Sequence, residues 1–175
     1  AILACATSTG RLALYALQCA SDVDGEHGEE RRADEGALSL LSRSDTADSL
    51  LLSLDWSLGS YGDAKIVVSQ SDGGLAIWRP LPAGGSPIQE LSPWHAHELR
   101  GGIPTEAWIS FFRRGLGDSW DCNFVISGAD DSLMKGWDLR AGGGSAPLPA
   151  FVCKKHDAGV TAGQWHPNRE YIFAR

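Results

Sequence analysis

The stretch from Val125 to Asp138 constrains the fold of this chain more than any other feature. Its residues, VISGADDSLMKGWD, form two largely apolar runs on either side of an Asp-Asp-Ser turn and end in a Trp-Asp pair. Short runs of this kind are typical of β-strands, and Asp and Ser favour tight turns. The stretch therefore predicts a β-hairpin. A single hairpin leaves apolar surface uncovered, so the chain needs further strands to pack against it.

Related hairpins occur twice more in the sequence. Val67–Trp78 aligns with the first stretch when the final aromatic residues are superposed, which places Asp72 over Asp131. A weaker copy, Ala4–Tyr15, has Gly10 at the turn. Repeated hairpins that end in Trp-Asp are typical of WD-repeat β-propellers, whose blades are four-stranded sheets. We therefore expect an all-β chain folded as a WD-repeat β-propeller.

The number of repeats predicts an incomplete propeller. Propellers commonly have four to eight blades, whereas this sequence holds about three blades and the start of another, so we expect a piece of a longer protein. The hairpins are spaced more widely than in a plain repeat of roughly 40–45 residues, which predicts insertions. The expected units are a partial blade at 1–20, an acidic mobile insertion at 21–46, blades at 47–92 and 94–154, and a truncated blade at 155–175.

Charge and composition exclude several classes of function. The net charge is −7, seven acidic residues fall between Asp22 and Glu35, and no basic stripe is present, which argues against direct binding of nucleic acid. No apolar run is long enough to cross a membrane. The four cysteines form neither a Cys-x-x-Cys pair nor a zinc-binding spacing, so we expect reduced thiols in an intracellular protein, with no metal and no cofactor.

Two histidines close together, His95 and His97, have two interpretations. Residues at i and i+2 lie on one face of a strand and could share a metal ion, but the sequence offers no third ligand at a recognisable spacing. The alternative is structural, because WD blades use a histidine that bonds the turn aspartate and, through a serine, the tryptophan. That hydrogen-bonded set, which we name the blade lock, would be His97, Ser127, Asp131 and Trp137.

Residues near the turn are candidates for acid–base chemistry. Asp130 and Asp131 are adjacent carboxylates, and such a pair can raise one pKa. Asp131 has the structural role just given, whereas Asp130 has none. His156 is the histidine expected to lock the last blade. The sequence has no Gly-x-Ser-x-Gly elbow, no His-Glu-x-x-His motif and no Gly-rich phosphate loop, so local motifs alone indicate a scaffold or binding module.

Three stretches resemble a known family, the diphthine methylesterases, which are WD-repeat proteins of diphthamide biosynthesis. The sequence WHAH at 94–97 is followed by EAWI at 106–109, and both are similar to that family's pattern. The hairpin at 127–140 resembles the family in having Gly136 before the tryptophan, where general WD repeats have Val or Ile. The resemblance continues over 155–170 and departs from the pattern at Gly163.

The resemblance implies a cytoplasmic hydrolase that removes the methyl ester from methylated diphthine on translation elongation factor 2. Without a nucleophile elbow, we expect water activated by a histidine or a carboxylate. Diphthine also carries a trimethylammonium group, which the ring of Trp94 or Trp108 could bind. The alternative function is a non-catalytic WD scaffold for a protein complex. The candidate catalytic residues are His97, Glu106, Asp130 and His156.

Overall fold

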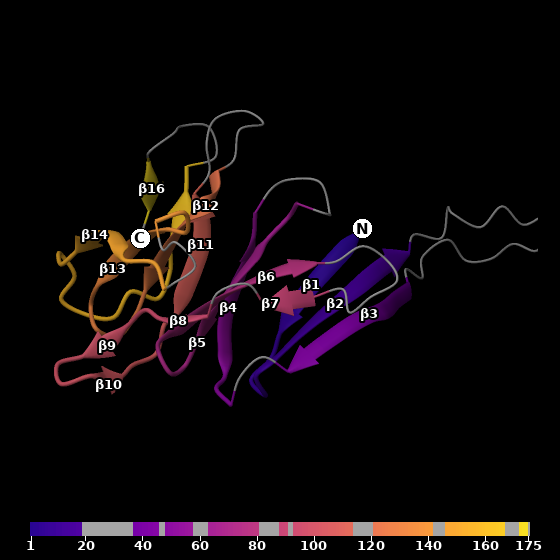
Figure 1. Cartoon of the computed structure of the whole chain (residues 1–175), viewed down its shortest axis with the longest axis horizontal. Helices are drawn as coiled ribbons and strands as arrows, with labels where there is room; N and C mark the ends of the chain where they lie inside the picture. The colour runs from indigo at the N-terminus through magenta and orange to yellow at the C-terminus, as the bar shows by residue number, and fades with distance from the viewer. Residues whose placement is uncertain are drawn as a thin grey trace, which may run out of the picture.

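A computed structural model describes residues 1–18, 37–45, 48–57, 63–80, 88–90, 93–113, 121–141, 146–166 and 172–174. Within these ranges every regular element is a β-strand. The strands form small antiparallel sheets that follow one another across the molecule in chain order, from β1–β3 at one side to β11–β14 at the other (Figure 1). This serial arrangement of sheets is the one expected for consecutive blades.

The first sheet has three strands in the order β1-β2-β3, where β1 spans Ile2–Ala6, β2 Arg11–Gln18 and β3 Ala37–Asp45. The third strand corrects the expectation of a mobile insertion over 21–46. Residues 37–45 pair with the whole length of β2, with one register shift between Leu14 and Tyr15. The leucines of this segment are exposed and Ser42 is buried. The acidic residues that suggested an insertion lie before the strand, outside the described residues.

The second sheet has the order β4-β5-β6-β7, and a short strand, β8, pairs with the start of β6. All five residues of β5 are buried, because neighbouring sheets cover both of its faces. The bounds are β4 Leu51–Trp56, β5 Ile66–Gln70, β6 Gly74–Pro80, β7 Ile88–Glu90 and β8 Trp94–His95.

The third sheet has the order β11-β12-β13-β14 and contains the hairpin that opened the sequence analysis. Two shorter pairs accompany it, β9 with β10 before it and β15 with β16 after it. The bounds are β9 Glu98–Leu99, β10 Ile103–Pro104, β11 Ile109–Arg113, β12 Asp121–Gly128, β13 Met134–Asp138, β14 Pro149–Cys153, β15 Gln164–Trp165 and β16 Phe173–Ala174.

Three apolar clusters join each sheet to the next. The cluster between the first and second sheets packs Leu12 and Leu14 against Ile66 and Trp78. The second and third sheets share a cluster, as do the third sheet and the β15–β16 pair. Successive residues of a strand point to opposite faces, so each inner strand contributes to two clusters. The core therefore lies between sheets, which is how propeller blades are stabilised.

A recurring backbone hydrogen bond links each hairpin turn to the start of the next unit. The amide of Leu51 donates to Thr7 O at 3.2 Å, that of Ala107 to Gln70 O at 3.1 Å, and that of Val160 to Ala129 O at 3.0 Å. The three acceptors precede the three turns by the same number of residues. This repetition shows that the turns are equivalent, and it fixes which residues correspond.

The pairing of strands makes the correspondence precise. Trp78 pairs with Ile66, and Trp137 pairs with Val125. Counting from these pairs places Val68, and not the neighbouring Ser69, at the position of Ser127. The turn residues after Asp72 and Asp131 both have positive φ, at 81° for Gly73 and 58° for Ser132. Residues other than glycine rarely adopt this backbone conformation, so its presence at both positions shows that the turn is the same in both sheets.

Candidate functional site

Three buried side chains of the third sheet and that of His97, which lies between β8 and β9, form a continuous series of hydrogen bonds, the predicted blade lock. Trp137 Nε1 donates to Ser127 Oγ at 2.8 Å, and Ser127 Oγ lies 2.7 Å from His97 Nε2. His97 Nδ1 lies 2.9 Å from Asp131 Oδ2. Because a carboxylate only accepts, His97 carries its proton on Nδ1, and its Nε2 accepts from the serine hydroxyl. Every polar side-chain atom of the blade lock therefore has a partner.

The order serine, histidine, aspartate is also that of hydrolytic triads. Ser127 and His97 are, however, both 0% exposed, and the indole N–H of Trp137 already donates a hydrogen bond to the serine oxygen. An ester would have to reach Ser127 Oγ to be attacked, and no path to it is open. The geometry is therefore the one expected for the predicted structural role, and it leaves His97 without a surface on which to meet a substrate.

Burial and hydrogen bonding set the protonation of the lock. Burial lowers the pKa of His97 below its ordinary value, against the opposing effect of the Asp131 hydrogen bond. Burial alone would raise the pKa of Asp131, but the hydrogen bond from His97, with smaller contributions from Leu133 N and Lys135, lowers it overall. At neutral pH the pair is thus a neutral imidazole beside a carboxylate.

Lys135 supplies the positive charge that balances this carboxylate. Its Nζ lies 3.6 Å from Asp131 Oδ2 and donates to Ala96 O at 2.7 Å. It also lies 5.9 Å from the ring centroid of Trp137. A buried carboxylate is costly without such partners, so Lys135 extends the lock by one member that the sequence analysis did not name.

A second group of candidates meets where β11 begins and the β12–β13 turn opens. Trp108 Nε1 donates to Asp130 Oδ1 at 2.8 Å, and the Asp130 amide donates to Glu106 O at 3.2 Å. Asp130 is exposed, Glu106 is half-buried and Trp108 is 37% exposed. We call Glu106, Trp108 and Asp130 the rim cluster. It is accessible to solvent, in contrast to the blade lock.

His156 and Trp94 both have buried ring nitrogens. Those of His156 have no hydrogen-bond partner among the described residues, and its role in locking the last blade stays a prediction. Trp94 is 5% exposed and packs edge-on against Trp137 with centroids 5.8 Å apart. Its ring is therefore part of the core, and of the two candidate rings Trp108 is the exposed one.

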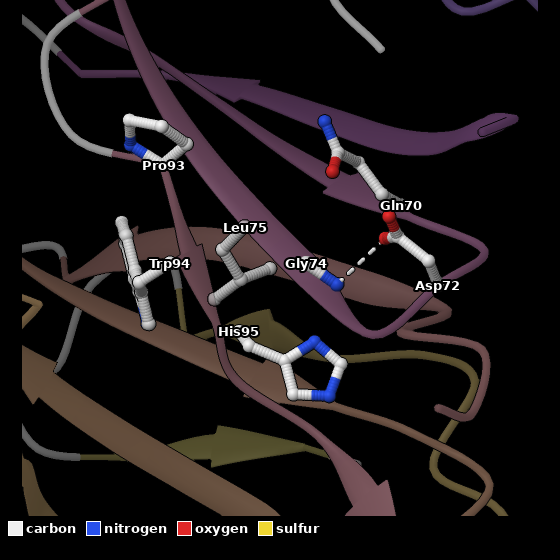
Figure 2. Close-up of a pocket in the computed structure, with 7 residues that line it drawn as sticks. All are labelled: Gln70, Asp72, Gly74, Leu75, Pro93, Trp94 and His95. Atoms are coloured by element: carbon white, nitrogen blue, oxygen red, sulfur yellow. Dashed lines mark hydrogen bonds between the residues drawn. The ribbon is translucent and has the colours of Figure 1, made fainter. Parts of the chain in front are cut away.

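A shallow pocket of about 280 Å³ is lined by the end of β5, the turn that follows it, the start of β6 and β8 (Figure 2). Asp72 and His95 contribute polar groups to it, but Asp72 Oδ1 accepts a hydrogen bond from Gly74 N at 3.0 Å, and His95 lies 4.0 Å from Glu98. None of the four catalytic candidates lines this pocket. Its lining residues are Gln70, Asp72, Gly74, Leu75, Pro93, Trp94 and His95.

The two neighbouring histidines do not form a metal site. Both nitrogens of His97 are engaged in the lock, so it has none left for a metal beside His95. In the part of the chain that the structure describes, no group of three or more His, Cys, Asp or Glu side chains could hold a metal ion. The same residues include no helix long and apolar enough to cross a membrane.

Comparison with known proteins identifies the family. Human diphthine methyltransferase is 37% identical over 135 residues, and its mouse counterpart is 36% identical over 130 residues; each match includes 71% of this chain. The chain belongs with the diphthine methyltransferases. It spans about a quarter of the length of these relatives, at 25% and 24%. The family resemblance inferred from the sequence is thereby confirmed. No protein-family model matches the chain.

The fold has a counterpart among solved structures. A chain in the crystal structure of the mitotic checkpoint complex superposes with a TM-score of 0.64 over 98% of this chain, at 15% identity and with 40% of that chain covered. At such low identity the likeness concerns the fold alone. It confirms the predicted class, an incomplete WD-repeat β-propeller.

Two features of the site were not foreseen in the sequence. The hydrogen bond between Trp108 and Asp130 joins residues 22 positions apart, and no local pattern links them. The β9–β10 hairpin, with Gly101 and Gly102 at positive φ, was not predicted. The paired glycines were the available indication, since adjacent Gly residues often form the turn of a hairpin.

Proposed function

We propose that the protein hydrolyses the methyl ester of methylated diphthine on translation elongation factor 2. The observation that carries this proposal is the 37% identity to human diphthine methyltransferase over 135 residues. That name describes methyl transfer on diphthine, and the sequence motifs shared with diphthine methylesterases favour hydrolysis as the form of the reaction. The proposal extends to a cytoplasmic location, where elongation factor 2 acts.

The reaction needs only water as its second substrate. The oxygen of water attacks the ester carbonyl carbon, the bond from that carbon to the methoxy oxygen breaks, and methanol and a carboxylate leave with release of one proton. Such a step requires a base for the water and a means of positioning the ester. No methyl donor takes part, which separates hydrolysis from methyl transfer.

Within this chain the rim cluster is the best candidate for contact with the substrate. His97 is excluded by its burial, and the nitrogens of His156 are also buried. Glu106 is half-buried, Asp130 is exposed, and the two residues are joined by the backbone hydrogen bond from Asp130 N to Glu106 O. We therefore assign Glu106 the role of general base and Asp130 a role in binding. Proximity of a carboxylate to a bound ester supplies both base and orientation.

The mass of the substrate tests the proposal. Protein expressed from its complete open reading frame is incubated with methyl-esterified elongation factor 2, with and without a methyl donor. We expect a loss of about 14 mass units and release of methanol in both incubations. Glu106→Gln should lower kcat/KM by roughly 10²–10⁴ with an unchanged melting temperature. A gain in mass that needs the donor would reject hydrolysis.

The alternative, a non-catalytic scaffold, is favoured by one specific observation. The pocket beside Trp94 is shallow and is lined by none of the four catalytic candidates, and WD propellers often serve as platforms for other proteins. An unchanged substrate mass, together with stable association of the protein with elongation factor 2 or with another partner, would support this second function.

A further inference from the structure

Trp108 combines exposure with a fixed position, which is unusual for an aromatic side chain outside the core. It is 37% exposed, while its indole N–H is held by the Asp130 carboxylate at 2.8 Å. A hydrogen bond at the nitrogen edge restricts rotation of the ring. It also polarises the indole, because donation to a charged acceptor increases the electron density of the ring. The ring is thereby better suited to attract a cation.

The position of Asp130 is itself determined by two other segments. Its amide donates to Glu106 O at 3.2 Å, and its carboxylate lies against Gly159. A Cβ added at Gly159 would be only 2.3 Å from Asp130 Oδ1, so a residue without a side chain is needed there for the carboxylate to occupy its place. Three separate parts of the chain thus build one tryptophan–carboxylate pair.

The fold does not require this pair. In the second sheet, Ser71 stands at the position of Asp130, and its hydroxyl accepts from Leu50 N at 3.0 Å. The equivalent of Trp108, counted from the recurring hydrogen bond, is Leu52. The second sheet therefore makes the same turn with a neutral residue at each of these two positions. The charged and aromatic side chains that the third sheet has there call for an explanation beyond folding.

We propose that Trp108 and Asp130 form a binding subsite for a trimethylammonium group, the cationic end of a diphthine-type substrate. The inference rests on the proposed function. A quaternary ammonium has no N–H to donate, so a hydrogen-bonding pocket cannot recognise it. An aromatic face beside a carboxylate can, through the ring quadrupole and the negative charge. Trp94 is excluded because it is buried.

Choline is the probe, and its neutral isostere, 3,3-dimethylbutan-1-ol, is the matched ligand. The protein from the complete open reading frame is labelled with ¹⁵N, and the indole signal of Trp108 is assigned as the one absent from Trp108→Phe. We expect choline to shift this signal and the neutral alcohol to leave it in place. Equal shifts with both ligands would mean an ordinary apolar patch and would overturn the subsite.

Four variants test which side chains contribute to binding of the cation. Trp108→Leu removes the aromatic face and should raise the KM for methylated elongation factor 2 by roughly 2- to 30-fold, with little change in kcat. Trp108→Phe keeps a ring and should lie between parent and Trp108→Leu. Asp130→Asn should weaken choline binding. Asp45→Asn removes the same charge from an exposed site on β3 and should behave as the parent.

The results separate the subsite from the reaction. A protein that binds choline through Trp108 but releases no methanol retains the subsite and rejects hydrolysis. A protein that hydrolyses the ester with the same KM in Trp108→Leu, folded as the parent, retains hydrolysis and rejects the subsite. A fall in kcat alone in that variant would also reject it, since binding of a remote cation should appear in KM.

Discussion

The second and third sheets build the same hairpin and complete it differently. In both, the turn aspartate accepts a hydrogen bond from the amide two residues later, from Gly74 to Asp72 and from Leu133 to Asp131, each at 3.0 Å. In the third sheet the aspartate continues into the blade lock through His97. In the second sheet, Asp72 has no histidine as a hydrogen-bond partner among the described residues.

Replacement of one residue accounts for much of this difference. Val68 lies where the third sheet has Ser127, so Trp78 has no hydroxyl to bond there. Its Nε1 is buried without a partner among the residues that the structure describes. Val68 is itself 0% exposed and packs in the cluster shared with the first sheet. The hairpin of the second sheet therefore forms without the lock, and we expect the lock to add stability and alignment to a blade already formed.

Substitutions at Ser127 and at Val68 should have unequal effects on stability. Ser127→Val would leave His97 Nε2 and Trp137 Nε1 buried and unpaired, and we expect it to lower the free energy of unfolding by about 2–4 kcal/mol. The reverse exchange, Val68→Ser, offers a hydroxyl to Trp78 Nε1 and should change stability by about 1 kcal/mol or less. Urea unfolding of both variants measures the difference. Equal losses would mean that the lock is not a specific feature of the third sheet.

The lock also predicts how stability depends on pH. The pKa of His97 is lowered in the folded state from 6.5, so unfolding takes up a proton once the pH falls below about 6.5, and stability should decline from there. The lowered pKa of Asp131 acts in the same direction at more acidic pH, below its unfolded value of 3.8.

Denaturant unfolding between pH 8 and pH 5 checks this dependence. His97→Gln should lose the part of the slope that lies near pH 6, because glutamine does not titrate. A parent protein whose stability rises on acidification through that range would contradict a neutral, buried His97.

The smallest effect concerns Gly136, which occupies the position of Ile77 in the second sheet. A Cβ added at Gly136 would lie 2.1 Å from the ring of Phe151, so the missing side chain makes room for that ring. Phe151 is 38% exposed and can move, so Gly136→Ala should cost about 1 kcal/mol. Combination with Phe151→Ala should remove most of the cost of the glycine substitution. Additive losses in thermal melts would show that Phe151 is not the reason for the glycine.

The sequence predicted the hairpins because turn residues and apolar runs are local properties. The hairpins predicted at Val67–Trp78 and Val125–Asp138 form as β5–β6 and β12–β13. The four members of the lock were also named, since the WD pattern assigns each a place. The strand at 37–45 was missed because the acidic run before it dominated the composition of that region.

The rim cluster could not be predicted, because it depends on contacts between segments. Trp94 and Trp108 look alike in sequence, and only the packing against Trp137 shows that Trp94 is core. The sequence assigned Asp130 no partner. In the structure Trp108, just before β11, lies beside it and donates a hydrogen bond to it. Local patterns thus identify elements, whereas the sites between elements follow from how the sheets pack.

The central claim is that the buried lock is structural and that the exposed rim cluster meets the substrate. Asp131→Ala tests it most directly, with stability and turnover measured on the same protein. We predict a fall of about 1–3 kcal/mol in the free energy of unfolding and unchanged methanol release per folded molecule. A variant that melts like the parent but no longer releases methanol would place Asp131 in the reaction and contradict this account.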